Sequence, residues 1–500
     1  MVIVMRKKTA IEMSKCLDDI SSGIKMIGNF KYNKYIVSKV EKIFKESLLK
    51  LGSEMDDIGK EQVEALKEAI KSVDATETNR LISEIKEFIS ENIVYKVVFM
   101  PYKASMWDSL ESIWMAADKD ERCEALVVPI TYYELDSNQN PIKKVNERGL
   151  FPEYVNTVND EEYDLENDLP DIIYIHNPYD DTNLVTRVDS RYYSWNLKKY
   201  CEKLVYVPYG KWVDGVSLPS FMIGMYNSDY AIQSSDNAVE KYSGMVNDYA
   251  ECFGIETVEA RKILRHKFVN LGSPKVDKVL SLNKENTLLP NDWKGKVLKS
   301  RVNVLYNTTL EEVLNARNLD KIRETLNFFK YNSSKAFTIW RPHPLMRQTL
   351  ISMLPNLLKE YDELMEEFCS GNYGIIDTNV DMYYSIFWSD MCYGFNNSSL
   401  NEIYKYTGKI VLQDFPKMAK ITSSISKENL LKKLKNTNVI TEPEWSLPDV
   451  VNVISDNIEL KIGKKLNLEN SGEKINNYMI DIIKKIKYVY NLNGNIRKYQ

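Results

Sequence analysis

The sequence predicts an α/β protein built from two doubly wound, Rossmann-like lobes and an N-terminal helical extension. Its 500 residues exceed what one ordinary core accommodates, so two large lobes are expected. Residues 1–93 follow a helical period, whereas the chain beyond them alternates short apolar runs with helix-like stretches in two blocks. Hydrophobic residues make up 44% and charged residues 27%, a globular balance that argues against disorder.

The helical extension is expected to span residues 1–93. Apolar residues recur there at helical spacing in two groups. These groups are Val63, Leu66 and Ile70, and then Leu81, Ile82, Ile85, Phe88 and Ile89. The pattern favours a helical hairpin or short coiled coil on the main body, with a role in packing or oligomerisation rather than in catalysis.

The first lobe is expected over residues 94–280, because short apolar runs begin there. These runs are Val94–Met100, Ala125–Ile130, Asp171–His176, Leu204–Pro208 and Tyr230–Ile232. Runs that are apolar on both faces are typical of parallel strands covered by helices.

The second lobe is expected over residues 281–440, with 281–300 as a linker. Its predicted strands are Val302–Tyr306, Ala336–Trp340, Gly374–Ile376, Met391–Tyr393 and Lys409–Leu412. Helix-like stretches lie between them, at 311–331, 344–369, 381–389 and 398–407. Such sheets bind ligands at the carboxyl ends of their strands, so chemistry is expected in the cleft between the lobes.

Charge and cysteine usage narrow the class of protein. The net charge of −5 lacks the basic excess that is typical of nucleic-acid-binding proteins. The six cysteines form no CxxC pair, which favours free thiols in a reducing compartment. The sequence contains no run of about 18 apolar residues, so no transmembrane helix is expected. We therefore expect a cytoplasmic protein.

His343 is the first candidate for chemistry, in the segment Trp340-Arg341-Pro342-His343-Pro344 after a predicted strand. The two prolines restrict the backbone and fix the direction of the side chain between them. Arg341 could hold two phosphate oxygens, and the imidazole could donate a hydrogen bond or a proton to a leaving phosphate. A structural turn histidine is the alternative.

The second candidate is the segment Phe395-Asn396-Asn397-Ser398-Ser399-Leu400-Asn401-Glu402. It follows a predicted strand and opens a helix, where Asn and Ser are good N-caps and free N–H groups attract anions. Glu402 would lie one turn into that helix, within reach of a ribose diol. An ordinary N-cap with a glutamate in the first turn is the alternative.

The third candidate is Leu271-Gly272-Ser273-Pro274-Lys275-Val276-Asp277, where the two blocks meet. Gly-Ser-Pro bends the chain, and Lys275 could lie near a phosphate. A plain turn between the lobes is the alternative.

Together these segments resemble the CDP-glycerol glycerophosphotransferase family, which has the glycosyltransferase-B fold. That family carries a Gly-x-Pro-Arg-x-Asp turn, an Arg-x-His-Pro-like strand end, a Ser-Asp pair, and an Asp-Tyr-Ser-Ser segment followed by Phe-Glu. The similar residues here are Gly272-Ser273-Pro274-Lys275-Val276-Asp277, Arg341-Pro342-His343-Pro344, Ser389-Asp390, and Asn397-Ser398-Ser399 with Glu402. The resemblance covers about residues 265–412.

The resemblance implies a transferase that moves glycerol phosphate, or a related alditol phosphate, from a CDP-activated donor to a hydroxyl acceptor. Its product would be a teichoic-acid-type cell-wall or capsular polymer. The first lobe would bind the acceptor and the second the nucleotide donor. His343 would assist the leaving phosphate, and no cofactor or metal is implied. The residues that would bind substrate are Arg341, Lys275, Asn397, Ser398, Ser399, Glu402 and Tyr209.

One departure from the family concerns its Trp-His-Gly-Thr loop, whose histidine acts as base. The similar place here is Val207-Pro208-Tyr209-Gly210-Lys211, so that Tyr209 stands where histidine is expected. A tyrosine with an ordinary pKa near 10 is a poor base at neutral pH. His176 ends the preceding predicted strand and could supply the base, oriented by Asp180 or Asp181. A structural or substrate-binding role for His176 is the alternative.

The C-terminal region, 441–500, is expected to hold helices and a basic tail. Residues 461–500 contain nine Lys and Arg against three Asp and Glu, and apolar residues mark one helix face. These are Ile475, Met479, Ile482, Ile483 and Ile486. Such a helix could rest on the inner leaflet, near a lipid-linked acceptor, or pack on the first lobe.

Two other functions stay open. A glycosyltransferase would use a nucleotide-sugar donor and release a nucleoside diphosphate. A non-catalytic scaffold of the same fold would release no nucleotide. This alternative is suggested by Tyr209, which stands where the family has its histidine.

Overall fold

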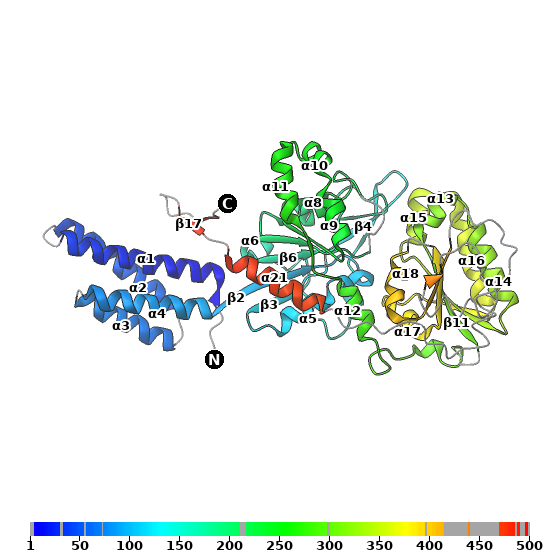
Figure 1. Ribbon diagram of the computed structural model, residues 1–500, viewed down its shortest axis with the longest axis horizontal. Helices are drawn as coiled ribbons and strands as arrows, with labels where there is room; N and C mark the ends of the chain where they lie inside the picture. Colours follow the sequence, from blue (N-terminus) through cyan, green and yellow to red (C-terminus); the bar gives the residue numbers. More distant parts are fainter. Residues whose placement is uncertain are drawn as a thin grey trace.

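The computed structural model describes residues 5–30, 34–54, 57–72, 74–210, 217–297, 301–395, 398–414, 439–440, 470–485, 488–490 and 496–498. Three bodies follow one another along its long axis: a helical bundle, a first lobe and a second lobe (Figure 1). Four residues named above lie outside the described residues: Lys211, Asn396, Asn397 and Ile486.

The N-terminal extension is a bundle of four helices rather than a single hairpin. They are α1 (Lys7–Phe30), α2 (Lys34–Glu54), α3 (Asp57–Lys71) and α4 (Ala75–Glu91). Fully buried Met13, Leu17, Leu66 and Ile85 lie in its core. The Asp74 side chain accepts the backbone N–H groups of Thr76 and Glu77 and so caps α4. A short strand, β1 (Met5–Arg6), pairs with the first lobe and joins the two bodies.

The first lobe is built on a parallel sheet in the order β3-β2-β6-β8-β9-β10. These strands are β2 (Ile93–Met100), β3 (Cys123–Val127), β6 (Ile172–Ile175), β8 (Lys203–Tyr206), β9 (Tyr230–Gln233) and β10 (Phe268–Asn270). The chain moves outward from β2 to β3 and then returns to β6, so the strand order reverses between β2 and β6.

Helices cover both faces of this sheet because both faces are apolar. Val97 and Phe99 of β2 point to one face, and Val98 and Met100 point to the other. The helices of this lobe are α5 (Glu111–Lys119), α6 (Leu165–Asp168), α7 (Ser194–Leu197), α8 (Ile223–Asn227), α9 (Asp236–Ser243), α10 (Val246–Phe253) and α11 (Thr257–Lys267). Short 3₁₀ turns occur at Ala104–Ser109, Arg148–Leu150 and Ser190–Tyr192.

Two features of the first lobe were not predicted. A small antiparallel sheet is formed by β4 (Tyr132–Leu135), β5 (Pro141–Val145) and β7 (Thr186–Val188). Strand β10 at the sheet edge was also missed. The residues of β5 are mostly exposed, so they carry little of the apolar signal on which strand prediction depends.

The C-terminal helix α21 (Ser471–Lys485) lies across α5 of the first lobe (Figure 1). Ile475, Met479 and Ile483 of the predicted apolar face are fully buried there. This face is therefore occupied by protein and is not open to a membrane leaflet. A strand pair, β17 (Tyr488–Tyr490) with β18 (Ile496–Lys498), follows it.

The second lobe has a parallel sheet in the order β13-β12-β11-β14-β15-β16, the strand order of a Rossmann fold. The strands are β11 (Val302–Thr308), β12 (Ala336–Pro342), β13 (Gly374–Ile376), β14 (Met391–Phe395), β15 (Ile410–Asp414) and β16 (Val439–Ile440). The strand order reverses between β11 and β14. The predicted class, an α/β protein with two doubly wound Rossmann-like lobes and an N-terminal helical extension, is confirmed.

Helices also cover both faces of the second sheet. One face holds α13 (Leu310–Ala316), α14 (Asp320–Tyr331), α15 (Met346–Met353) and α16 (Leu358–Ser370). The other holds α12 (Pro274–Ser281), α17 (Tyr383–Trp388) and α18 (Ser399–Tyr404). The predicted linker is partly core, because Trp293 in the short turn Asn291–Trp293 is fully buried against this face.

Candidate active site between the two lobes

The carboxyl ends of the strands of both lobes border the space where the lobes meet. A pocket there is lined by Val207, Gln233 and Gly272 of the first lobe and by Ile403 and Tyr406 of the second. Ligands of doubly wound sheets bind where the strand order reverses. In the first lobe that place lies between the ends of β2 and β6, and in the second between the ends of β11 and β14.

His176 lies at the first of these places, directly after β6, and it is fully buried. Its Nε2 atom accepts the backbone N–H of Tyr102 at 3.1 Å, and its Nδ1 atom lies 3.1 Å from Ser109 Oγ. Ser109 donates its own hydroxyl hydrogen to the Met106 carbonyl, so Nδ1 carries the ring hydrogen and donates to Ser109. Both ring nitrogens are thus bonded within the lobe.

The electrostatic surroundings keep this ring neutral. Burial, with a further contribution from the nearby Lys275 cation, lowers the pKa of His176 to about 3. The predicted carboxylate support is absent at Asp180, whose two oxygens accept the backbone N–H and hydroxyl of Ser194. Asp181 is exposed. The role of His176 as a base stays a prediction, and in this arrangement its Nε2 lone pair is already occupied.

Tyr209 lies after β8 and faces the same region. Its hydroxyl is 2.8 Å from that of Tyr179, and its ring packs edge-on against His176 with the centroids 6.4 Å apart. Burial raises the pKa of Tyr209 further above its ordinary value, so the phenol is no better a base than expected. Its predicted part in binding substrate stays a prediction.

His343 lies after β12, beside the second reversal point, and it is partly exposed. Its backbone N–H donates to the carbonyl of Thr308, the last residue of β11, at 3.0 Å. Its Nδ1 accepts the backbone N–H of Leu345 at 3.1 Å, so the neutral ring carries its hydrogen on Nε2. The Pro-His-Pro backbone therefore presents an N–H donor of fixed position.

Two cations act on His343, one from each lobe. Burial, Arg341 and Lys103 lower the pKa of His343 to about 4. Lys103 follows β2 in the first lobe and is itself buried, with Nζ 2.6 Å from the Tyr132 hydroxyl and 3.3 Å from a Glu147 oxygen. Burial lowers the pKa of Lys103. A neutral N–H donor is thus placed near two cations, each of which is also paired with a carboxylate, Arg341 with Asp377 and Lys103 with Glu147.

Arg341 does not point to an open site. Its Nη1 atom donates to Asp377 at 2.6 Å and to the Asn379 carbonyl at 3.0 Å, and its Nη2 atom donates to the Val380 carbonyl at 3.4 Å. Both Arg341 and Asp377 are buried. The guanidinium therefore holds the loop after β13, and its predicted grip on phosphate stays a prediction.

The Ser398 segment opens α18 as predicted. Ser398 is buried and accepts the Asn401 N–H at 3.4 Å as N-cap, and its hydroxyl also contacts the Asn307 side chain of β11. Gly394 of β14 permits this close packing, because a Cβ there would lie 2.7 Å from the Asn307 carbonyl oxygen. Glu402 contacts Lys405 and accepts from Gln413 at 3.4 Å. Ser399 begins the helix, which has only six residues.

The Gly272–Asp277 turn ties several elements together. Gly272 has φ +89°, a conformation that glycine adopts readily. Lys275 is buried and pairs with Asp108 at 2.7 Å, and the Tyr383 hydroxyl of the second lobe donates to the same Asp108 oxygen at 2.9 Å. Lys275 thus lies in a buried contact between the lobes. Its predicted phosphate contact stays a prediction.

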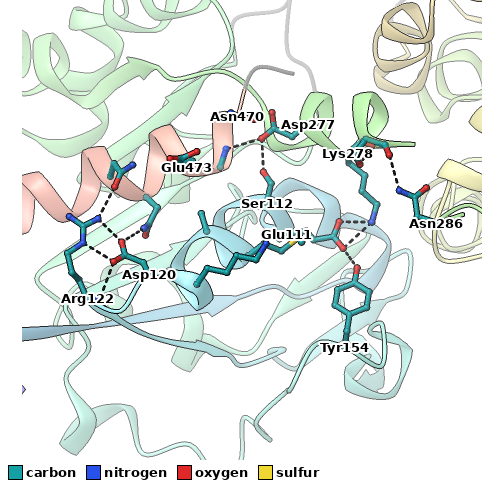
Figure 2. Close-up of a pocket in the computed structure, with 17 residues that line it drawn as sticks. Glu111, Ser112, Asp120, Arg122, Tyr154, Asp277, Lys278, Asn286, Asn470 and Glu473 are labelled. Atoms are coloured by element: carbon teal, nitrogen blue, oxygen red, sulfur yellow. Dashed lines mark hydrogen bonds and ion pairs between the residues drawn. The ribbon is translucent and has the colours of Figure 1, made fainter. Parts of the chain in front are cut away.

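Asp277 belongs to a separate cavity of about 700 Å³ beside α5, α12 and α21 (Figure 2). It caps α21 by accepting the N–H groups of Ser471 and Gly472 at 3.0 and 2.9 Å. Nearby, Glu111 pairs with Lys278 at 2.8 Å and accepts the Tyr154 hydroxyl (Figure 2). The charged groups at this end of the cavity satisfy one another.

Sequence reasoning missed Lys103, Asp108, Glu147 and Tyr383. One feature of the sequence could have identified Lys103. It lies shortly after the predicted strand Val94–Met100, as His176 lies at the end of its own predicted strand. The others lie in turns and short helices whose partners are distant in sequence. Within the described ranges, no group of three or more His, Cys, Asp and Glu could hold a metal ion. No helix in the described part of the chain is long and apolar enough to cross a membrane.

Comparisons with known proteins give likenesses to solved structures. No family model matches the chain, and a comparison with curated proteins finds no match. The UDP-GlcNAc 2-epimerase of Methanocaldococcus jannaschii, in complex with UDP-GlcNAc and UDP, is 15% identical with a TM-score of 0.44, over 77% of this chain and 99% of that one. The epimerase of Rickettsia bellii is 13% identical with a TM-score of 0.40, over 78% and 99%.

The wall teichoic acid polymerase TagF is also similar, at 12% identity and a TM-score of 0.40, over 85% of this chain and 98% of that one. Likenesses at this level concern the fold and not the activity. The two lobes themselves are established by the strand orders of their sheets.

Proposed function

We propose that this chain is a transferase that moves glycerol phosphate, or a related alditol phosphate, from a CDP-activated donor to a hydroxyl acceptor. The observation that carries the proposal is the His343 ring, whose Nε2–H is fixed by the Leu345 hydrogen bond and which lies near Lys103 of the opposite lobe. A phosphate between the lobes would meet this positioned N–H donor. The family resemblance of the segments around His343 and Ser398 supports the same substrate class.

In the proposed reaction the acceptor oxygen forms a bond to the glycerol-bearing phosphorus. The bond from that phosphorus to the bridging oxygen breaks, and its electron pair leaves with CMP. His343 would donate its Nε2–H to phosphoryl oxygen as charge develops, because a ring of low pKa is neutral and donates a hydrogen bond without carrying an extra proton. Binding of the phosphate would raise the pKa of His343 and bring proton donation to CMP within reach.

The acceptor proton needs a base, and His176 stays our prediction for that role. In the described arrangement the Tyr102 N–H occupies its Nε2, so this role requires the segment after β2 to move when substrate binds. The proposal places the reaction in the cytoplasm, at the inner face of the membrane where a lipid-linked acceptor would be found.

Donor binding tests the proposal. Isothermal titration with CDP-glycerol, CDP-ribitol, UDP-GlcNAc and CMP should show the CDP-alditols binding at least as tightly as CMP, and UDP-GlcNAc more weakly. His343→Ala should weaken CDP-glycerol but not CMP, because the second phosphate is the one that His343 would contact. His266→Ala, an exposed histidine on α11, is the matched control. Preferred binding of UDP-GlcNAc would favour glycosyl transfer, and no nucleotide binding would favour a scaffold.

A further inference from the structure

A buried contact between the lobes lies directly beside the segment that holds His176. Asp108 of the first lobe is 8% exposed, and its Oδ2 atom accepts from Lys275 Nζ at 2.7 Å and from the Tyr383 hydroxyl at 2.9 Å. Lys275 belongs to α12 and Tyr383 to α17, and both helices cover one face of the second sheet. Asp108 is therefore held by two helices that pack on the second lobe.

This contact leaves the Asp108 carboxylate incompletely satisfied. Its second oxygen, Oδ1, is buried and has no hydrogen-bond partner among the described residues. A buried carboxylate oxygen without a partner makes an arrangement less stable than one in which both oxygens are bonded. The contact between the lobes thus holds Asp108 with less than its full set of hydrogen bonds, which favours a contact that can be released.

The residue that follows Asp108 contacts the ring of His176. Ser109 Oγ lies 3.1 Å from His176 Nδ1 and accepts its hydrogen. Asp108 and Ser109 end the same short 3₁₀ turn, Ala104–Ser109, so displacement of one displaces the other. The Ser109 contact fixes the ring with Nε2 against the backbone N–H of Tyr102. A continuous chain of contacts therefore runs from α17 of the second lobe to this ring through two consecutive residues.

The other end of this segment is held within the first lobe. Glu147 accepts the backbone N–H of Ala104 at 2.8 Å, and its other oxygen lies 3.3 Å from Lys103 Nζ. The contact with the second lobe therefore acts on the Asp108–Ser109 end, which is the end that holds Nδ1 of the histidine ring.

We propose that Asp108 and Tyr383 are positioning residues that couple the contact between the lobes to the ring of His176. While Asp108 is held, Ser109 keeps the ring turned toward Tyr102, and both ring nitrogens are occupied. When the lobes rearrange around a ligand and Asp108 is released, Ser109 moves with it, and the ring can turn to present a nitrogen to the space between the lobes. In the proposed reaction this step would supply the base, and that consequence alone rests on the proposed function.

Modification of the full chain by diethyl pyrocarbonate, followed by peptide mass spectrometry, tests this inference without substrate. The reagent acylates an accessible, unprotonated histidine nitrogen, so buried His176 should react slowly in the wild type, whereas exposed His266 should react in every variant. Tyr383→Phe should raise the rate at His176, relative to His266, about tenfold or more, because it removes a hydrogen bond to a buried carboxylate. Backbone amide exchange in residues 104–110 should rise with it.

Two variants separate this coupling from a general loss of stability or of lobe contact. Tyr404→Phe is matched in chemistry, because it removes a fully buried hydroxyl that lies 2.9 Å from Ser389 Oγ within the second lobe. Gln348→Ala removes a different hydrogen bond between the lobes, from Gln348 Nε2 to the Leu135 carbonyl at 2.8 Å. Both variants should leave the reactivity of the buried histidine unchanged.

If His176 reacts no faster in Tyr383→Phe than in the wild type, the inference is overturned. Equal acceleration in Tyr404→Phe or Gln348→Ala would also overturn it, because the ring would then respond to general loosening of the molecule. So would an equal rise of amide exchange in the buried strand β11, which would indicate loss of the fold rather than release of one segment. None of these outcomes depends on the nucleotide that the chain releases, so the inference and the proposed function can fail separately.

Discussion

The two histidines at the strand ends of the two lobes occupy comparable places and have different surroundings. His176 follows β6 beside the reversal point of the first sheet, and His343 follows β12 beside that of the second. His176 is fully buried, with both ring nitrogens bonded to residues of its own lobe. His343 is partly exposed, with Nδ1 held by backbone and Nε2 bearing the hydrogen.

The difference separates His176, whose two ring nitrogens are both bonded within its lobe, from His343, whose Nε2–H is the donor that we propose a ligand meets. His176 connects β6 to the segment after β2, because it binds both Tyr102 and Ser109. His343 is held by the Pro-His-Pro backbone and by the ends of two strands, and its donor atom is not consumed by that support. Position at a strand end is thus insufficient to identify a catalytic histidine.

The largest expected effect concerns the support of the second-lobe site. Arg341→Ala should lower the free energy of unfolding by about 3–5 kcal/mol, because it leaves the buried Asp377 carboxylate without its cation. Urea unfolding measures this loss. The control is Arg347→Ala, which removes an exposed ion pair with Asp362 and should cost about 1 kcal/mol or less. If the two variants lose similar amounts of unfolding free energy, Arg341 is not needed for stability and would be available to bind a ligand.

His343→Ala should lower the rate of transfer about 100-fold or more while the fold survives, because a positioned donor to the reacting phosphate is lost. Steady-state release of CMP from CDP-glycerol measures this effect. The control His266→Ala changes an exposed histidine and should keep the wild-type rate. If His343→Ala keeps the wild-type turnover, the proposed difference in function between His343 and His176 is wrong.

The pH dependence of the free energy of unfolding should show the titration of His176. Its pKa is about 3 in the folded chain and about 6.5 when unfolded, so the unfolded state takes up a proton first as the pH falls. Stability should therefore be unaffected above pH 6.5 and should decline by about 1.4 kcal/mol per pH unit between pH 6.5 and 3 from this group. Unfolding of the wild type and His176→Gln at pH 7 and pH 4.5 isolates this contribution.

The same variant tests the predicted role of His176 as base. A base of ordinary pKa would give a limb near pH 6 to 7 in the rate profile, whereas a ring held at a pKa of about 3 gives none there. If the segment after β2 stays in place, we expect the pH–rate profile to contain no limb due to His176. A limb that disappears in His176→Gln would show that substrate binding opens this site.

The smallest effect is expected at Tyr209. Tyr209→Phe removes one hydrogen bond to Tyr179 and should cost about 1 kcal/mol of stability. Transfer should change little, because burial keeps this phenol protonated. A large loss of activity with unchanged stability would assign the role of base to Tyr209 instead of His176.

Local patterns were enough to predict most of the two sheets. The apolar runs of β2, β6, β11 and β12 are buried along nearly their whole length, so composition alone marks them. The exposed β5 and the short edge strand β10 lack that signal. The bundle was underestimated because helical spacing predicts helices but not how many of them pack together.

The candidate site was predicted less completely, because its contacts join distant parts of the chain. Arg341 is paired with Asp377, which directly follows the neighbouring strand β13, and no local motif links the two. His176 is enclosed by Tyr102 and Ser109, which lie in the segment after another strand. Strand ends can be located from sequence, whereas the partner that satisfies a polar group there depends on tertiary packing.

The most direct test of the proposed function is the nucleotide that the chain releases. Purified protein would be incubated with CDP-glycerol or UDP-GlcNAc, each with glycerol phosphate or a glycerol-phosphate-terminated lipid in detergent, and released nucleotides would be separated by ion-exchange chromatography. We predict acceptor-dependent CMP from CDP-glycerol, reduced about 100-fold in His343→Ala and unchanged in His266→Ala. Release of UDP from UDP-GlcNAc without CMP, or equal CMP release by the wild type and His343→Ala, would contradict the proposal.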